Sequence, residues 1–381
     1  MYRDLIPHWA SLGWKTNVVM SQAQYRSGRS RSWDGENVEI TWIPCFGLVP
    51  KGRISKLCVI LLYVLLGSLK TLFGKPVGLN VFLTQPPLFF VWGWVLRVIR
   101  AQPYYIVLMD LYPDVAIEAG LLKRKSLVGR FMLTVSRFGL RKADGVVVIG
   151  RCMQARLKSL GVNSERIHFV PNWTDEQLVF PVPHDENQFR EENGWIDRFV
   201  VLYSGNLGVS HYFEDLLEVA RRLRHQKELV FAFIGEGQRS SEIRTYVERH
   251  GLENIQLLPF QSQDRLAESL SAGDVHFVSL RDGFEGIVVP SKSYGVFASG
   301  RPVIFQGPEQ SEIYRLVKEH GLGSTVGLGC EDQLEEIILS YLSERGLATS
   351  QGAKARELAM REFSRDAACE RYTRVLERAG R

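Results

Sequence analysis

Two turns in this chain of 381 residues combine glycine, serine and lysine in an order that suits phosphate chemistry. Residues 201–217 read VLYSGNLGVSHYFEDLL, and residues 289–304 read VPSKSYGVFASGRPVI. Each turn leads into a predicted helix, and the first turn of a helix offers unpaired backbone N–H groups at the positive end of its dipole. Phosphate groups bind well at such helix starts. The two stretches therefore predict a site for the diphosphate of a nucleotide sugar.

A carboxylate follows a strand of the first half. Residues 104–109 form an apolar, β-like run, and Asp110 comes directly after it. Ligands of open parallel sheets bind beyond the carboxyl ends of the strands, so Asp110 is a candidate for acid–base chemistry. The alternative role for an acid at this place is to cap the helix that follows Pro113, and we expect that role for Asp114.

The cysteines do not form a metal or disulfide pattern. The five are scattered, odd in number and without a Cys-x-x-Cys or Cys/His spacing: Cys45, Cys58, Cys152, Cys330 and Cys369. Neither a disulfide framework nor a zinc site is predicted, and we expect no metal and no bound cofactor. The first nine residues mix polar and apolar side chains, so they do not predict a signal peptide, and a cytoplasmic location is expected.

The two halves of the chain differ in charge. Residues 1–172 contain 23 Lys and Arg against 9 Asp and Glu, whereas the remainder contains 24 against 33. A basic half suits either nucleic acid or an anionic membrane surface. Because its basic residues alternate with long apolar runs, the membrane surface is favoured and no nucleic-acid partner is expected. The alternative is ordinary solvated charge.

Two apolar blocks lie in the basic half. Residues 57–66 read LCVILLYVLL, and the basic residues that flank them are Lys51, Arg53, Lys56, Lys70 and Lys75. The run is shorter than the roughly 18 to 20 apolar residues that a membrane span requires, so we predict a helix in the membrane interface. A buried core helix is the alternative. The second block, residues 86–99, contains Trp92 and Trp94, a residue type that is favoured at headgroup depth.

The chain begins with an unexpected element. Apolar residues repeat at helical spacing over residues 2–12, and a strand is predicted over 16–20. A doubly wound domain normally begins with a strand and a glycine-rich turn, and here the first predicted element is the helix that should follow them. We therefore expect that the start codon is misplaced or that the first strand is missing. If the strand exists, the gene should encode it in frame upstream of Met1.

The second half alternates between strands and helices. Predicted strands lie in residues 199–204, 229–234, 254–259, 274–279 and 302–305, and predicted helices lie in 212–226, 239–251, 264–272, 291–299 and 309–319. This alternation predicts βα units with a parallel sheet. Prolines at 171, 181 and 183 mark a linker. We predict an N-terminal domain over residues 1–180, a C-terminal domain over 181–365 and a helix over 366–381 that packs back on the body.

The order of these motifs resembles a known family. A Ser-Gly-Asn-Leu-Gly turn opens the second half, Phe-Ile-Gly-Glu-Gly follows it, and Pro-Ser-Lys precedes Ala-Ser-Gly-Arg-Pro. In the first half, Ala-Asp-Gly-Val-Val-Val-Ile-Gly is followed by Val-Pro-Asn-Trp-Thr-Asp. Together they resemble the family 4 retaining glycosyltransferases of the GT-B fold, and are similar in particular to bacterial polysaccharide and lipopolysaccharide N-acetylfucosamine transferases. The resemblance covers nearly the whole chain and implies an α/β protein with two Rossmann-like, doubly wound domains that face a cleft.

The resemblance assigns roles at the donor diphosphate. Gly205 and Gly208 would let the backbone approach the diphosphate at the start of a helix that begins at Tyr212. Lys292, just inside the next helix, would add a cation. The alternative for Lys292 is a solvated helix residue.

Other residues would contact the rest of the donor. They are Asn206, Leu207, Glu236, Gly237, Glu285, Ser291 and the segment Pro259, Phe260 and Gln261, whose backbone would contact the base. Two departures from the family are visible. Many relatives bind ribose through a second glutamate, and Gly295 stands at that place in this chain. Relatives also often place Arg and Lys after the first strand of the second domain, where this chain has Asn206 and His211. His211 is therefore either a diphosphate donor or a surface helix residue.

The sequence thus predicts a retaining glycosyltransferase of cell-surface polysaccharide biosynthesis. It would move a sugar from a nucleotide diphosphate sugar, expected to be UDP-linked, to a polyprenyl-diphosphate-linked saccharide, and would bind peripherally at the cytoplasmic face of the inner membrane. Lys292 and the amides of residues 205–208 would stabilise the departing diphosphate without a metal, and Asp110 would orient or deprotonate the acceptor hydroxyl. A non-hydrolysing UDP-sugar epimerase and a non-catalytic membrane-associated partner protein are the alternatives.

Overall fold

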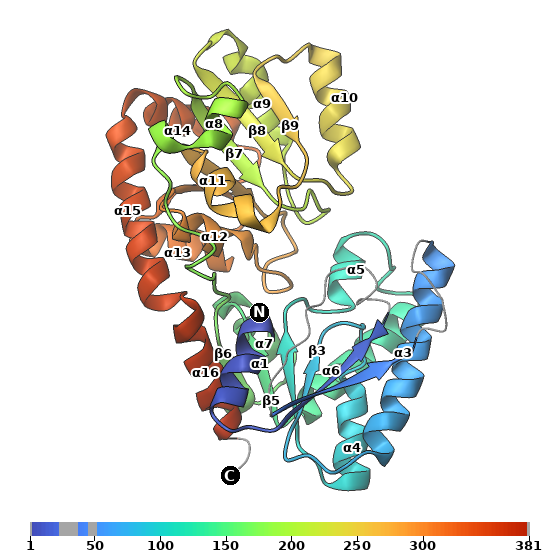
Figure 1. Cartoon of the computed structure of the whole chain (residues 1–381). Coiled ribbons are helices and arrows are strands. Elements are labelled where there is room, and N and C mark those ends of the chain that lie inside the picture. The colour runs from blue at the N-terminus through green and yellow to red at the C-terminus, as the bar shows by residue number, and fades with distance from the viewer. Residues whose placement is uncertain (1, 23–36, 45–51, 379–381) are drawn as a thin grey trace.

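The computed structural model describes residues 2–22, 37–44 and 52–378, and Cys45 and Lys51 lie outside these ranges. Two α/β domains are stacked in Figure 1, the first below the second. The red helices of the C-terminal segment run from the second domain down to the first. The first and last described helices, α1 Tyr2–Ser11 and α16 Arg365–Glu377, both lie at the first domain.

The first domain contains two parallel sheets. The strands β3, β4, β5 and β6 pair in chain order, while β1 and β2 pair only with each other among the described residues. The strands are β1 Thr16–Ser21, β2 Val38–Ile43, β3 Asn80–Leu83, β4 Tyr104–Leu108, β5 Gly145–Val148 and β6 Ile167–Phe169. The helices are α1 Tyr2–Ser11, α3 Arg53–Phe73, α4 Val91–Arg100, α5 Asp114–Glu118, α6 Leu127–Lys142 and α7 Arg151–Ser159. The described strands of this domain do not form one continuous sheet, and the missing first strand stays a prediction.

Apolar side chains fix the four-stranded sheet between two helical layers. All residues of β4 and β5 are buried, which is typical of central strands in a parallel sheet. Leu96 of α4, Leu140 of α6 and Met153 of α7 belong to the core on one face. Leu5 and Trp9 of α1 belong to the core on the other face. The sheet is therefore covered on both sides.

Helix α3 is attached to the domain through one side only. The Tyr63 hydroxyl donates to the Val19 carbonyl at 3.0 Å, and Arg100 of α4 donates to three carbonyls at and just beyond the end of α3. The large apolar side chains that α3 exposes to solvent are Leu57, Ile60, Leu61, Leu65, Leu69 and Phe73. Because a core helix would bury these side chains, the alternative of a buried core helix is wrong.

The length of α3 corrects another expectation. The helix has 21 residues, and its stretch Ser55–Phe73 has a mean hydropathy of 1.9 with 11% of the window buried. By length and composition this stretch could cross a membrane, so the apolar run is not too short to span. The prediction counted only as far as Leu66, whereas the exposed Leu69 and Phe73 continue the apolar surface along the same helix.

The second apolar block packs inside the domain, contrary to the expectation that it faces a membrane. Phe90 is buried, the Trp92 indole donates to Thr71 Oγ1 at 2.9 Å, and Trp94 packs edge-on against Phe138. These side chains fill the layer between α3, α4 and α6. The apolar side chains that α4 exposes are instead those at its end, Val98 and Ile99.

The second domain contains a six-stranded parallel sheet in the order β12-β11-β10-β7-β8-β9. The strands are β7 Phe199–Ser204, β8 Leu229–Ile234, β9 Ile255–Leu258, β10 Val275–Ser279, β11 Val303–Gln306 and β12 Gly323–Val326. The helices are α8 Gln188–Glu192, α9 Glu214–Arg222, α10 Ser240–His250, α11 Leu266–Ser271, α12 Lys292–Ala298, α13 Glu312–His320 and α14 Glu331–Ser343. This is the doubly wound arrangement that the alternating pattern predicts. The winding direction reverses between β7 and β10, which are neighbours at the centre of the sheet.

The chain crosses between the domains twice. The first crossing is the linker after β6, and the second is the pair α15 Arg345–Glu362 and α16 Arg365–Glu377. The two crossings touch, because the Thr174 amide donates to the Phe363 carbonyl at 3.1 Å and the Arg365 amide donates to Glu176 at 3.1 Å. Tyr372 of α16 then packs in the same core as α1. The last helix of the chain therefore covers the sheet of the first domain.

Hydrogen bonds also join the two domains directly. Glu312, at the start of α13, accepts from the Arg151 amide at 2.5 Å and from Arg151 Nε at 2.9 Å. Arg151 pairs in addition with Glu319 at 2.7 Å. The Leu111 amide of the first domain donates to the Ile287 carbonyl of the second at 2.9 Å. Around these contacts one apolar core extends through both domains.

Candidate functional site

The loops that follow β7 and β10 meet at the centre of the second sheet, because these two strands are neighbours. In an open parallel sheet, ligands bind at the carboxyl ends of the strands where the winding reverses. The loop after β7 carries residues 205–213, and the loop after β10 leads into α12. The Arg281 amide donates to the Ser210 carbonyl at 2.8 Å and ties the loops together. Both turns that the sequence singles out therefore lie at this point.

Two glycines allow the turns after β7 and β8 to approach each other. Gly205 has φ +139° and Gly235 has φ +135°, in the left-handed region that favours glycine. A Cβ on Gly235 would lie 2.1 Å from the Gly205 carbonyl oxygen. The Gly205 amide donates to the Ile234 carbonyl at 2.8 Å, and the Leu207 amide donates to the Glu236 carbonyl at 3.0 Å. The turn after β7 is therefore fixed against the turn after β8.

The turn after β7 leaves backbone donors open. Within the described part of the chain, the amides of residues 208–210 donate to no acceptor. The amides that follow are occupied, because that of His211 donates to the Gly208 carbonyl at 3.2 Å and that of Tyr212 donates to Ser279 Oγ at 3.0 Å. Successive free N–H groups are a donor surface that suits an anion.

The start of α9 is not the phosphate site that the sequence predicts. The helix begins at Glu214 rather than at Tyr212, and its first turn carries Glu214 and Asp215. Glu214 accepts from the Phe213 amide at 2.9 Å, and the buried Asp215 accepts from Gln306 at 2.6 Å. Two carboxylates already occupy the positive end of this helix, and Glu214 also pairs there with Arg239 and Arg281, so the helix start is not free for a phosphate. The open amides before the helix are the better site.

Lys292 lies at the first position of α12, and its side chain reaches Gly205. Its ammonium donates to the Tyr203 hydroxyl and to His211 Nε2 at 3.2 Å, and lies 3.8 Å from the centre of the Tyr203 ring. Among the described residues no carboxylate pairs with it. Burial lowers the pKa of Lys292 well below its usual value. A half-buried cation without a counterion is suited to an anionic ligand, and this is not the environment of a solvated helix residue.

His211 takes neither of the two roles that the sequence leaves open. It lies before α9 and is 8% exposed, so it is not a surface helix residue. Its Nδ1 lies 2.7 Å from the Ser279 carbonyl oxygen and its Nε2 faces Lys292. Burial, with a smaller contribution from the charge of Lys292, lowers the pKa of His211 to about 3. A neutral ring whose two nitrogens are occupied is not a charged donor to a diphosphate.

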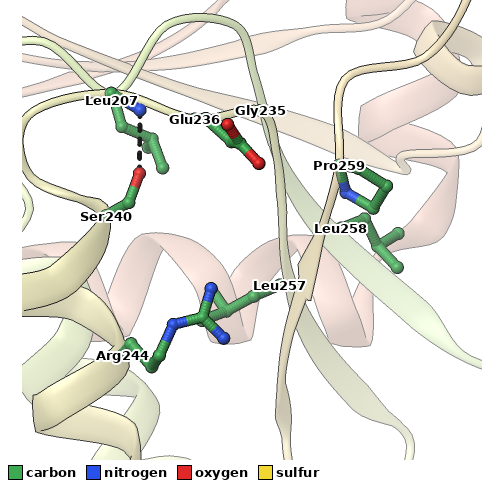
Figure 2. Close-up of a pocket in the computed structure, with 9 residues that line it drawn as sticks. Leu207, Gly235, Glu236, Ser240, Arg244, Leu257, Leu258 and Pro259 are labelled. Carbon is green, nitrogen blue, oxygen red and sulfur yellow. Dashed lines mark hydrogen bonds between the residues drawn. The ribbon is translucent and has the colours of Figure 1, made fainter.

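A pocket of about 600 Å³ lies at the ends of β8 and β9 beside α10. The residues that line it are Leu207, Gly235, Glu236, Gly237, Ser240, Arg244, Leu257, Leu258 and Pro259. Figure 2 shows the Arg244 side chain extending from α10 alongside Leu257, with Glu236 across the pocket from it. Walls that combine apolar side chains with the polar groups of Glu236, Ser240 and Arg244 can hold a flat heterocycle such as a nucleobase. Because Leu207 lines this pocket and Gly205 contacts Lys292, pocket and cation lie on either side of one turn.

Sequence reasoning found part of this pocket. Of the predicted donor-binding residues, the structure brings together Leu207, Glu236, Gly237 and Pro259 as pocket lining. The functional candidates that it missed are Tyr203, Gly235, Ser240, Arg244, Leu257 and Leu258. Tyr203 and the two leucines have the pattern of ordinary strand residues, and Arg244 has that of an exposed helix residue. Only the Gly-Glu-Gly turn carried a signal that could have included Gly235.

The remaining donor-binding candidates do not line the pocket. Phe260 is exposed and its ring approaches Gly235, while Gln261 donates to the Pro259 carbonyl at 2.9 Å. The Asn206 carbonyl accepts from the Tyr203 hydroxyl at 2.7 Å. Ser291 is the N-cap residue of α12, and its side chain makes no capping hydrogen bond.

Asp110 and Glu285 lie on loops that meet at the contact between the domains. Asp110 follows β4 and directly precedes Leu111, whose amide donates to the Ile287 carbonyl. Burial raises the pKa of Asp110 above its usual value. Oε2 of Glu285 is buried and accepts no hydrogen bond within the described residues, so it is available to a ligand hydroxyl.

The other acids nearby have structural roles. Asp114 is the first residue of α5 rather than its N-cap residue, and it pairs with Arg156 at 3.1 Å and with Arg124 at 3.6 Å. In the part of the chain that the structure describes, no group of three or more His, Cys, Asp or Glu side chains could hold a metal ion. Asp110 and Glu285 are thus acids of this region that form no ion pair within the described residues.

Two family models match the chain. The model described as "Glycosyl transferase 4-like domain" matches residues 2–173, and the model described as "Glycosyl transferases group 1" matches residues 185–357. The first match holds the strands β1 to β6, and the second holds β7 to β12. The linker between the matches and helix α16 lie outside both.

Two curated proteins are similar to the chain. A probable glycosyltransferase of Pseudomonas aeruginosa, WbjE, is 32% identical over 244 residues, which are 63% of this chain and 60% of that protein. The putative colanic acid biosynthesis glycosyl transferase WcaI of Escherichia coli strain K12 is 28% identical over 241 residues, which are 63% of this chain and 58% of that protein. The matches therefore span about three fifths of the length of these relatives.

Solved structures share the architecture over nearly the whole chain. Sucrose-phosphate synthase from Thermosynechococcus elongatus has a TM-score of 0.77 at 18% identity, covering 99% of this chain and 92% of that one. Anabaena HepE in complex with UDP-glucose has a TM-score of 0.70 at 15% identity, covering 94% and 91%. At such identities the likeness shows the fold. The expected GT-B fold, with two Rossmann-like domains, is confirmed.

Proposed function

We propose that this chain, which belongs to the two-domain glycosyltransferases of the GT-B fold, transfers a sugar from a nucleoside diphosphate sugar in polysaccharide biosynthesis. The observation that carries the proposal is the setting of Lys292, a half-buried cation whose neutral partners are Tyr203 and His211, the latter directly after the open amides of residues 208–210. The pocket on the other side of the same turn would take the base. The curated relative WcaI, which is assigned to colanic acid biosynthesis, supports the polysaccharide pathway.

The departing group would be the nucleoside diphosphate. As the bond between sugar and diphosphate breaks, negative charge gathers on the diphosphate, and Lys292 with the open amides would stabilise it. Within the described residues no carboxylate pairs with Lys292, so its positive charge is not neutralised and the ammonium can act without a metal. We propose UDP as the nucleotide, supported by the UDP-glucose complex of HepE. Retention of configuration, implied by the family resemblance, is part of the proposal.

The acceptor would be activated from the first domain. The raised pKa of Asp110 suits a general base, and its position beyond β4 places it beside the loop that leads to Lys292. The unpaired buried oxygen of Glu285, on that loop, would accept a hydrogen bond from a hydroxyl of the sugar. Donor sugar and acceptor would therefore meet where the two domains touch.

The acceptor that we propose is a polyprenyl-diphosphate-linked saccharide at the cytoplasmic face of the inner membrane. The exposed apolar side of α3 is flanked by the exposed Lys56 and Lys70, and the end of α4 adds Val98 and Ile99. Apolar surface with flanking cations suits an anionic membrane. Since one side of α3 is hydrogen-bonded to the domain, we propose that the helix lies in the membrane interface and does not cross the bilayer.

The test is an assay with purified protein, UDP-sugars and a lipid extract of bacterial membranes, read by mass spectrometry. We expect release of UDP and a lipid-linked saccharide that has gained one sugar. Epimerised UDP-sugar without any acceptor would favour a UDP-sugar epimerase instead. UDP binding without turnover on any acceptor would favour a non-catalytic membrane-associated partner protein. A protein that binds no nucleoside diphosphate would overturn the proposal.

A further inference from the structure

Both ring nitrogens of His211 have defined hydrogen-bond directions. Nδ1 lies 2.7 Å from the Ser279 carbonyl oxygen, and Nε2 lies 3.2 Å from Lys292 Nζ. Because a carbonyl can only accept, Nδ1 carries the hydrogen and Nε2 presents its lone pair to the ammonium. The ring also packs edge-on against Tyr203, and the His211 carbonyl accepts from Arg239 at 2.7 Å. The histidine is therefore fixed in this orientation from several sides.

The ammonium of Lys292 has three N–H donors. One donates to the Tyr203 hydroxyl and one to His211 Nε2, and the third has no acceptor within the described residues. The Tyr203 hydroxyl gives its own hydrogen to the Asn206 carbonyl at 2.7 Å, so its lone pairs face the ammonium. Two neutral acceptors thus fix the ammonium and leave one donor for a ligand oxygen.

We propose that His211 is a positioning residue for the donor: as a neutral acceptor it holds the Lys292 ammonium so that its free N–H faces the diphosphate. The inference rests on the proposed function, because it describes how that site takes a nucleoside diphosphate. A second cation at position 211 would repel Lys292. The neutral ring instead keeps a single charge in one place, which is a different task from binding the diphosphate itself.

The charged groups around His211 and Lys292 do not disturb the hydrogen bond between these two side chains. From α9, Glu214 pairs with Arg239 at 2.8 Å and with Arg281, and these two guanidinium groups also donate to the His211 carbonyl. The carboxylate is thereby neutralised and does not pair with the ammonium. Burial raises the pKa of Tyr203 far above its usual value, so the phenol of β7 stays neutral. With a pKa lowered to about 3, His211 also stays neutral in the physiological range.

The test measures binding of UDP by calorimetry across pH for the wild type, His211→Phe and His211→Gln. Lys292 must be charged to bind, so UDP affinity should fall as pH rises, at a pH below the usual value for lysine. Phenylalanine removes the acceptor, so the Kd near neutral pH should rise about tenfold, as for the loss of a hydrogen bond to a charged group. The alkaline fall in affinity should also move to lower pH. Glutamine offers one acceptor and one donor and should restore the Kd to within about twofold.

Two further measurements distinguish a positioning role of His211 from an effect of the substitution on folding. The control His225→Phe changes an exposed histidine after α9 and should leave the Kd unchanged. Nitrogen NMR of the wild type at neutral pH should show the Nδ1-protonated tautomer for His211. An unchanged Kd and alkaline fall in His211→Phe, failure of glutamine to restore binding, or a protonated Nε2 would each overturn the inference. If the wild type binds no nucleoside diphosphate, the proposed function fails and this inference fails with it, whereas binding by the wild type with an unchanged Kd in His211→Phe overturns this inference alone.

Discussion

At the scale of single residues, the charge of Lys292 is held in an unfavourable place until a ligand binds. A cation that leaves water without a counterion loses hydration free energy. The lowered pKa expresses this loss, because the charged form is less favourable in the folded chain than in the unfolded chain. Below the lowered pKa the charged side chain therefore destabilises the fold, and as pH rises this destabilisation is relieved between that value and the usual pKa of lysine. A bound diphosphate would relieve it at neutral pH.

Replacement of Lys292 by alanine should lower kcat by about a hundredfold or more. The lost contact is made mainly to the departing diphosphate, and such a contact contributes on the order of 2 to 4 kcal/mol to the transition state. The variant should unfold at no lower temperature than the wild type, because a half-buried unpaired cation is removed. The control Lys227→Ala changes an exposed lysine and should keep wild-type kcat. Wild-type turnover in Lys292→Ala would exclude the assigned role.

The carboxyl group of Asp110 should appear in the pH dependence of kcat/KM. A base acts only when deprotonated, so the rate should rise with pH through the Asp110 pKa, which burial places above the usual 3.8. In Asp110→Asn this acidic limb should disappear, and the rate should fall by about a hundredfold. Asp197→Asn, which changes an exposed acid of the second domain, is the control. An acidic limb that persists in Asp110→Asn would assign it to another group.

At the scale of elements, the alternation of strand-like and helix-like segments was sufficient to predict most of the second domain. All five predicted strands and all five predicted helices are present there, with shifted ends. The pattern missed β12, because its residues Gly323–Val326 are small or polar and form a partly exposed edge strand. It also placed the start of α9 too early, because it did not show that Glu214 and Asp215 would occupy the first turn.

The candidate site was predictable only where a motif carries it. The Pro-Ser-Lys and glycine-turn motifs pointed to Lys292 and to residues 205–208. The role of His211 depends on the carbonyl of Ser279, which is 68 residues away in the sequence. Arg244 becomes a candidate only because the fold places it at the pocket. Contacts of this kind between distant segments leave no periodicity or spacing in the sequence.

The exposed side of α3 should attach the protein to anionic liposomes. Apolar burial contributes about 25 cal/mol per Å², and each basic residue near an anionic surface adds about 1 kcal/mol. Attachment should weaken with salt without vanishing, because salt screens the charges and leaves the apolar contribution. In a co-sedimentation assay, Leu61→Glu with Leu65→Glu should stay in the supernatant at salt concentrations where the wild type still sediments.

A matched control and an extraction complete this test. Leu178→Glu with Ile196→Glu places the same charges at exposed apolar positions outside the first domain's helices and should sediment like the wild type. Alkaline carbonate should release the wild type from liposomes, since an interfacial helix does not cross the bilayer. Wild-type protein that stays in the supernatant with anionic liposomes at low salt would remove the membrane contact, and resistance to carbonate would show that α3 spans.

At the scale of the whole molecule, the contact of Glu312 with Arg151 holds the domains together. Glu312 is 1% exposed, and it accepts from both the backbone and the side chain of Arg151. In Glu312→Ala both donors lose their acceptor, and because Arg151 is 32% exposed, water reaches its guanidinium. We expect a loss of about 2 kcal/mol in the free energy of unfolding, measured by urea denaturation. Glu319→Ala removes only an exposed partner of Arg151 and should cost less than about 1 kcal/mol. Equal losses in both variants would contradict the role of Glu312.

The two chain crossings between the domains also limit how the domains can move relative to each other. A body joined to another at one point can swivel in every direction, whereas a body joined at two neighbouring points turns only about the line through them. The linker and the α15–α16 segment cross side by side, with Thr174 bonded to Phe363 and paired with Ser364. They therefore define a hinge axis between the domains. Because the Glu312–Arg151 contact, the Leu111–Ile287 hydrogen bond and a shared apolar core also join the domains, opening about this axis requires that these contacts separate. A donor carried on the second domain would then travel along one arc and return to the same alignment with Asp110 at each closure.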